Sequence, residues 1–286
     1  MMNLIELFDT CNNRRDYVTV KREDGKKKYE VDYKFVEEDD ILYIFFEPSD
    51  GRTDWKVNFS YWRKPYADME ISYRVHGGFL ESWKLIKDTI RAKVTERDYV
   101  APMCEDNTYA YKWHRIIIAG YSHGGALAAL CHECVWYERE DLRNIKDAIV
   151  GISFDGPRVF AGLKIPAALK ERWAQFYVFR NHSDIVTHLP PVIFFFRHVG
   201  NKVRIGVGEN PGWISAHYPD NIRASLEDFM ENGKNSLREN IVSAIQGIGK
   251  TASEIAERFD ADGDRDLDAD AIKEKIGEIV KNKIEK

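Results

Sequence analysis

The pattern of apolar and polar positions predicts buried strands that alternate with amphipathic helices. Residues 115–121 carry three consecutive isoleucines, which suits a strand covered on both faces. Small apolar residues then continue over 124–138 with the composition of a buried helix. Further strands are predicted at 28–36, 41–46, 148–154, 175–179 and 202–207, and further helices at 79–94, 166–173 and 221–230. This alternation predicts an α/β fold with a mostly parallel sheet and helices on both faces.

The pattern changes near residue 233. All but one of the aromatic residues lie upstream, Phe259 being the exception. The tail shows two apolar stripes at helical spacing: Ile241, Ile245, Ile248, Ala252, Ile255 and Phe259, then Ile272, Ile276, Ile279, Val280 and Ile284. We therefore predict a main domain over 1–232 and a helical hairpin over 233–286, either an appendage of that domain or a surface for self-association through the C-terminal helices.

The connection between the two tail helices resembles an EF-hand loop. Asp260, Asp262 and Asp264 stand at the spacing of calcium ligands. Arg265 replaces the turn glycine and Ala271 replaces the bidentate carboxylate, so any Ca²⁺ site is expected to be weak and structural. The alternative is a solvated acidic turn whose aspartates cap the second helix.

Composition excludes several classes of protein. Hydrophobic residues make up 44% of the chain and aromatic residues 13%, as in a folded globular protein. A net charge of −5 provides no basic footprint for nucleic acid. Residues 1–12 lack the features of a secretory signal and no apolar run is long enough to span a membrane, which predicts a cytoplasmic protein. Cys131 and Cys134 have the spacing of half a zinc site, but without a second pair they are better interpreted as buried helix residues.

A serine stands between the predicted central strand and its helix. Ser122 occupies a Gly-x-Ser-x-Gly frame, as in a nucleophile elbow. We expect the strand and the helix to approach so closely at Gly120 and Gly124 that a Cβ atom would not fit, which explains why both positions are glycine. The amide of His123, at the start of the helix, is a candidate donor to a developing oxyanion.

A serine nucleophile needs a histidine base and an acid that orients it. In a sheet of this type they follow the serine in the order acid, then histidine. Asp184, in the loop after the strand 175–179, is the preferred acid, with Asp155 as the alternative. His217 is the preferred base because it lies in a glycine-rich loop before a helix. His198 is the second choice, and His188 is expected to be structural.

Four segments together resemble the class 3 lipases, the fungal-type triacylglycerol lipase family of the α/β-hydrolase superfamily. These segments are Val75-His-Gly-Gly-Phe79, Gly120-Tyr-Ser-His-Gly-Gly125, Phe154-Asp-Gly-Pro-Arg-Val159 and Asp184-Ile-Val-Thr-His-Leu-Pro-Pro191. Their order and spacing agree with the family over about residues 40–230. The resemblance implies an α/β-hydrolase fold, to which the predicted hairpin is added.

The resemblance also implies roles for residues. Ser122 becomes the nucleophile, Asp184 the orienting acid and His217 the general base. A second oxyanion donor maps onto the amide of Ser49. The segment after it would form a short aromatic lid that includes Trp55, Phe59 and Trp62, or alternatively a strand with aromatic packing.

We therefore expect a serine hydrolase that cleaves carboxylic esters of lipids, or small esters, without a cofactor in catalysis. Contact with a membrane or micelle surface would bring it to such substrates. One alternative is a phospholipase A1 or lysophospholipase acting on intracellular membranes. Another is a catalytically silent binding domain.

Overall fold

A seven-stranded sheet forms the centre of the molecule. The computed structural model describes residues 1–25, 27–48, 62–66, 73–100, 108–233 and 235–246. The strands lie in the order β1 (Val18–Asp24), β2 (Lys27–Glu38), β3 (Ile41–Phe46), β8 (Arg115–Tyr121), β9 (Ile149–Phe154), β11 (Phe176–Asn181) and β13 (Asn201–Ile205). From β3 to β13 all neighbours are parallel, whereas β1 and β2 add an antiparallel edge. The predicted, mostly parallel sheet is confirmed.

The central strands are apolar throughout because both faces of the sheet are covered. In β8, Ile116 and Ile118 belong to the hydrophobic core on one face, and Ile117 and Ala119 to the core on the other. All seven residues of this strand are buried. Successive side chains of a strand point to opposite faces, so an uninterrupted isoleucine run serves both cores at once.

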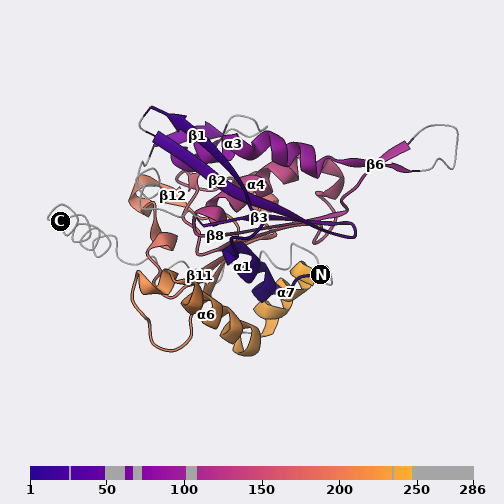
Figure 1. Ribbon diagram of the computed structural model, residues 1–286. Coiled ribbons are helices and arrows are strands. Elements are labelled where there is room, and N and C mark those ends of the chain that lie inside the picture. The colour runs from indigo at the N-terminus through magenta and orange to yellow at the C-terminus, as the bar shows by residue number, and fades with distance from the viewer. Residues whose placement is uncertain (26, 49–61, 67–72, 101–107, 234, 247–286) are drawn as a thin grey trace.

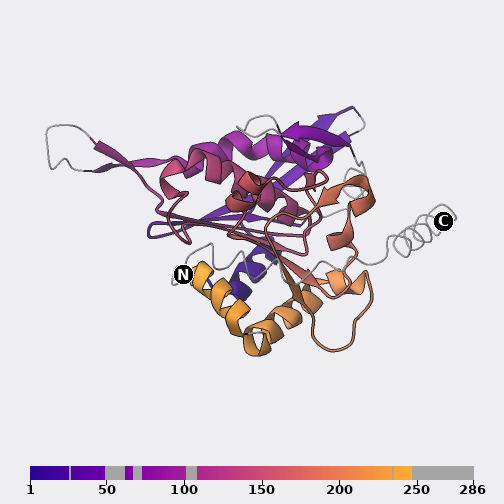
Figure 2. The ribbon, with the colours of Figure 1, turned by 180° about the vertical axis from the view of Figure 1, so that it is seen from behind.

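Helices form a layer on each face of the sheet (Figures 1 and 2). One layer contains α3 (Gly77–Val94) and α4 (His123–Glu138), with the short α5 (Ala167–Arg172) contributing Leu169 to the same core. The other contains α1 (Leu4–Asn12), α6 (Pro219–Asn232) and α7 (Asn235–Gln246). None of the described helices is both long and apolar enough to cross a lipid bilayer.

Two smaller sheets lie outside the central one; of their strands, only one in the segment after Ser49 was considered from the sequence, as the alternative to a lid. The strands β4 (Arg63–Tyr66), β5 (Tyr73–His76), β10 (Phe160–Ala161) and β12 (Phe196–Arg197) form an antiparallel sheet. A hairpin of β6 (Arg97–Val100) and β7 (Thr108–Tyr111) extends away from the body of the molecule (Figure 1). These strands have two to four residues each, too few to show a period in the sequence.

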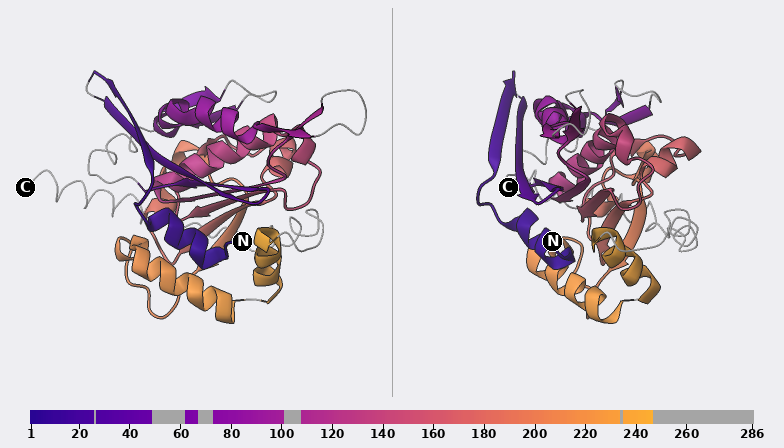
Figure 3. Two further views of the ribbon diagram at one scale, coloured as in Figure 1. Left: turned by 45° about the vertical axis from the view of Figure 1, so that its right-hand side comes forward. Right: turned by 90° about the vertical axis from the view of Figure 1, so that its right-hand side faces the viewer.

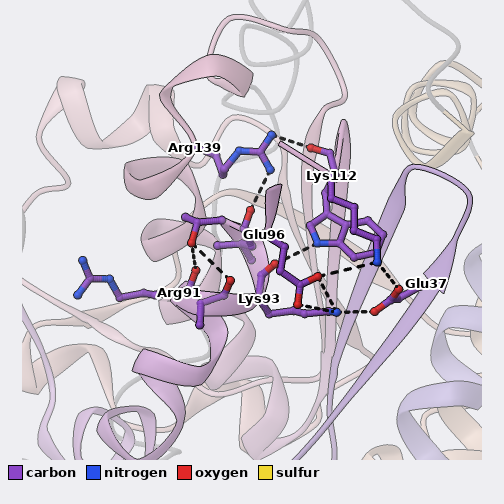
Figure 4. A network of polar contacts seen from close by, with 10 residues as sticks. Glu37, Arg91, Lys93, Glu96, Lys112 and Arg139 are labelled. Carbon is purple, nitrogen blue, oxygen red and sulfur yellow. Dashed lines mark hydrogen bonds and ion pairs between the residues drawn. The ribbon is translucent and has the colours of Figure 1, made fainter. Parts of the chain in front are cut away.

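A polar network holds the end of α3 against the sheet (Figure 4). Lys93 bonds to Glu96 at 2.9 Å and also to Glu37 of β2, while Lys112 bonds to Glu37 at 3.0 Å. The buried guanidinium of Arg139 donates to the carbonyls of Val94 and Trp113, at 3.0 and 2.6 Å. The network joins α3, β2 and the chain that enters β8, which fixes where the central strand begins.

The first helix of the predicted tail packs on the main domain (Figure 3). In α7, Ile241, Ala244 and Ile245 are buried in the same core as the sheet residues on that face. The guanidinium of Arg115, at the start of β8, donates to the carbonyl of Ala244 at 2.6 Å and also to that of Ile245. The rest of the predicted hairpin, with Asp260, Asp262 and Asp264, lies outside the described residues, and the division at residue 232 stays a prediction.

Candidate active site

Ser122 lies in a tight turn between β8 and α4. Its backbone has φ 55° and ψ −122°, a conformation that costs energy in a residue with a side chain. The turn is held by a hydrogen bond from the Ser122 amide to the Phe154 carbonyl, at 2.9 Å. A Cβ atom on Gly120 would lie 2.1 Å from the Gly124 carbonyl oxygen, and one on Gly124 would lie 2.3 Å from that of Phe46. Neither position therefore has room for a side chain, because the backbones of strand and helix approach too closely.

A histidine and an aspartate stand in line with the serine. The His217 Nε2 atom lies 2.9 Å from Ser122 Oγ. The other ring nitrogen, Nδ1, lies 2.6 Å from Asp184 Oδ2. The second oxygen of Asp184 accepts a hydrogen bond from the Val186 amide at 2.8 Å. Since a carboxylate only accepts, Nδ1 carries the hydrogen and Nε2 is free to take the hydroxyl proton.

The loops that carry these side chains are fixed by bonds to the ends of the strands. Asp184 follows β11, and His217 ends the short helix η4 (Ser215–His217) before α6. The Asn181 side chain donates to the Ala216 carbonyl at 2.8 Å. The Tyr121 hydroxyl donates to the carbonyl of His217, and the two rings lie 5.2 Å apart. The position of the imidazole is thus fixed both by the hydrogen bond to the His217 backbone and by the bond from its ring to Asp184.

Burial determines the charge of the site. It lowers the pKa of His217 to about 4, so the ring is neutral near pH 7 and able to act as a base. Burial also raises the pKa of Asp184, while the hydrogen bond from the Val186 amide acts in the opposite direction. His123 is buried next to the serine, and burial lowers its pKa to about 4.

The other two candidate histidines bond to backbone carbonyls rather than to the serine. His188 Nδ1 bonds to the Asp184 carbonyl at 2.8 Å, which suits the structural role expected of it. His198 Nε2 bonds to the Thr187 carbonyl at 2.7 Å. Of the three histidines considered, only His217 is hydrogen-bonded to Ser122 in the described structure.

One group among the described residues has the spacing of metal ligands. An oxygen of Asp155, an oxygen of Asp184 and a ring nitrogen of His217 lie within 4.8 Å of one another. His217 Nδ1 donates to Asp184, however, and so presents no lone pair to an ion. The arrangement suits proton transfer better than metal binding. Cys131 and Cys134 are not part of this group and are buried on α4.

The predicted oxyanion donors and lid are only partly described. The His123 amide begins α4, directly after the serine, as expected. Ser49, Trp55 and Phe59 lie outside the described residues. Trp62 is 54% exposed, and its carbonyl accepts a hydrogen bond from the Gly77 amide at 2.7 Å. The second donor and the lid therefore stay predictions.

Comparison with known proteins identifies the family. The sequence pattern described as Lipase (class 3) matches residues 43–194, more than half of the chain. This chain belongs to the class 3 lipases. The match includes Ser122 and Asp184 and ends before His217.

Individual relatives are distant. A lipase of Rhizomucor miehei is 25% identical over 190 residues, which cover 66% of this chain and 46% of that protein. A secreted mono- and diacylglycerol lipase of Fusarium solani is 27% identical over 150 residues, 51% of this chain and 38% of that one. The chain thus spans less than half the length of these relatives. A solved structure of Rhizomucor miehei triacylglyceride lipase has a TM-score of 0.48 at 21% identity, covering 67% of this chain and 68% of that one.

The relatives correct one expectation. A cytoplasmic location was predicted from the features of residues 1–12 and from the lack of a long apolar run, yet the Fusarium solani relative is named a secreted lipase. The prediction of a cytoplasmic protein is therefore wrong. The physical basis of that prediction was weak, because neither the composition of twelve residues nor the lack of a spanning segment says where a folded protein acts.

Proposed function

We propose that this class 3 lipase is a serine hydrolase that cleaves carboxylic esters of lipids through an acyl-enzyme. The observation that carries the proposal is the chain of hydrogen bonds from Ser122 Oγ through His217 to Asp184, at 2.9 and 2.6 Å. This arrangement at the carboxyl ends of parallel strands suits nucleophilic catalysis.

In the proposed reaction, Ser122 Oγ attacks the ester carbonyl while His217 Nε2 takes its proton. Asp184 stabilises the imidazolium that forms. The His123 amide donates to the oxyanion, together with a second donor for which Ser49 is our candidate. His217 then returns the proton to the leaving alcohol, and water, activated by the same ring, releases the acid and regenerates the serine.

We propose acylglycerol esters as the substrates, because the Fusarium solani relative is named a mono- and diacylglycerol lipase. We further propose that the enzyme meets them at the surface of a membrane or micelle. A series of ester substrates of increasing acyl length, offered below and above the concentration at which they form micelles, measures both preferences. Flat rates across the series, with no change at micelle formation, would contradict both.

The test of the chemistry is Ser122→Ala, assayed with p-nitrophenyl esters. We expect the rate to fall at least about a thousandfold, since removal of a serine nucleophile leaves only binding and oxyanion stabilisation. Ser225→Ala is the matched control, because Ser225 is also buried but lies on α6. Undiminished turnover by folded Ser122→Ala would disprove the assignment.

A further inference from the structure

A second aspartate stands beside the proposed triad. Asp155 directly follows β9, the strand between β8 and β11 in the sheet. Ser122, Asp155 and Asp184 thus follow three adjacent parallel strands at the same edge. Asp155 is fully buried and has a positive φ of 46°. The proposed reaction assigns it no role.

The hydrogen bonds of Asp155 join the ends of two strands. Its amide donates to the Phe179 carbonyl at 2.9 Å, and its Oδ1 accepts from the Asn181 amide at 2.6 Å. The Oδ2 atom accepts no hydrogen bond from any described donor. One carboxyl oxygen is therefore engaged as an acceptor, while the other is available to carry a proton.

Two buried carboxyl groups this close do not both ionise. Asp155 and Asp184 each place an oxygen within 4.8 Å of the other. Two carboxyl groups form a hydrogen bond with each other only if one of them holds a proton. Asp184 already accepts from His217 and from the Val186 amide, so it is the better anion. The proton therefore belongs to Asp155, whose pKa is raised by burial and by the neighbouring Asp184 carboxylate.

We propose that Asp155 is a positioning residue that keeps its proton and donates it in a hydrogen bond to the Asp184 carboxylate. This inference rests on the proposed function, since it assigns Asp155 to the same site. The neutral donor holds Asp184 in the orientation that His217 needs. It also limits the basicity of Asp184, so that His217 gives up its own proton more readily.

Among the residues that the structure describes, four titratable or charged groups face Asp155 or interact with it. These are Asp184 after β11, His217 in η4, Arg180 in β11 and Tyr121 in β8. Of these, only His217 changes charge in the proposed reaction. Loss of the Asp155 donor makes Asp184 more basic, which strengthens its hold on the His217 proton and raises the pKa of His217. If Asp155 were ionised instead, its removal would take away a negative charge and lower the pKa of His217.

The direction in which the pKa of His217 shifts is measurable in the pH dependence of kcat/KM. Asp155→Gly accommodates the positive φ and removes the carboxyl group. We expect the acid limb to move up by about one pH unit, the worth of one charged hydrogen bond, with kcat falling more than KM rises. Asp155→Asn also tolerates this backbone and keeps a donor, so it is expected to return the limb toward its original position.

Three results would overturn the proposal: an acid limb that stays in place in Asp155→Gly, one that moves to lower pH, or one that Asp155→Asn fails to restore. A lower kcat without a shift of the acid limb would mean that Asp155 acts only by accepting the hydrogen bond from the Asn181 amide. An inactive wild-type enzyme would instead count against the proposed function.

A readout independent of activity is the infrared spectrum at pH 7. We expect the C=O stretch of a protonated carboxyl group in the wild-type protein to be missing from Asp155→Asn. The difference between the two spectra isolates this group from other buried acids. Identical spectra in that region would show that Asp155 is ionised and would overturn the proposal, even if the Asp155→Gly variant failed to fold.

Discussion

At the scale of single residues, the site depends on where the protons of Ser122 and His217 lie. Ser122 must hold one until His217 is ready to take it, and His217 must present an unprotonated Nε2. The tautomer is set by Asp184, which accepts from Nδ1 at 2.6 Å. Burial then keeps the ring neutral, because a cation is poorly solvated there.

The pH dependence of catalysis follows from this neutral ring. Burial lowers the pKa of His217 to about 4, below its ordinary 6.5. Since the base works only when unprotonated, a lowered pKa extends activity to lower pH. We expect the acid limb of kcat/KM, measured with a soluble short-chain ester, to have its midpoint below pH 6.5. A midpoint at or above that value would mean that the imidazole is solvated or that its cation is stabilised.

At the scale of elements, the serine is presented by a strand and a helix in contact through backbone atoms. The carbonyl of Gly124 occupies the space that a side chain on Gly120 would need. Main-chain atoms at such a crossing cannot rotate away, so the approach is lost if either glycine acquires a side chain.

Gly120→Ala tests this approach. A Cβ atom 2.1 Å from a backbone oxygen forces α4 away from β8 and displaces Ser122 from His217. We expect a loss of stability of about 1–3 kcal/mol by chemical denaturation and a drop in esterase activity larger than stability alone explains. Gly77→Ala is the matched control, since its Cβ would meet its nearest neighbours at 3.1 Å and requires only small shifts. Equal activity in both variants would contradict the account.

The elements with strong patterns could be predicted from the sequence, and the short ones could not. The run 41–46 forms β3 with the same bounds, and the helix predicted at 124–138 begins one residue earlier. Helix α1 was missed, although Asn3 and Glu6 form a capping box that signals its start. The two-residue strands β10 and β12 exist only because they pair with distant partners, which no local pattern reveals.

At the scale of the whole molecule, the site combines residues that are far apart in the chain. Ser122 and His217 are 95 positions apart, yet the order of strands in the sheet brings them together. Because the fold fixes the order serine, acid, histidine along the chain, the candidate acid and base could be predicted from the sequence. The part played by Asp155 could not, because its protonation depends on burial and on the closeness of a second carboxyl group.

Burial of histidines also makes the stability of the whole fold depend on pH. Burial lowers the pKa of His132, on α4, to about 3. The unfolded chain binds a proton near pH 6.5 and the folded one does not, so stability is complete above that pH and is lost as the pH falls toward 3. We expect the titration of His132 to lower the free energy of unfolding of the wild type by about 2 kcal/mol between pH 7 and pH 5.

The His132→Gln variant lacks this titration. Its free energy of unfolding, measured by denaturant at both pH values, should therefore fall less than that of the wild type by the same amount. Parallel losses in the two proteins would show that His132 is protonated in the folded state.

The central claim is that Ser122 is a nucleophile activated by His217. Its most direct test is to treat the folded protein with a fluorophosphonate probe and locate the adduct by mass spectrometry. The account predicts a single adduct on Ser122, absent from Ser122→Ala and formed much more slowly in His217→Ala. An unlabelled wild-type protein, or an adduct on another residue, would contradict it.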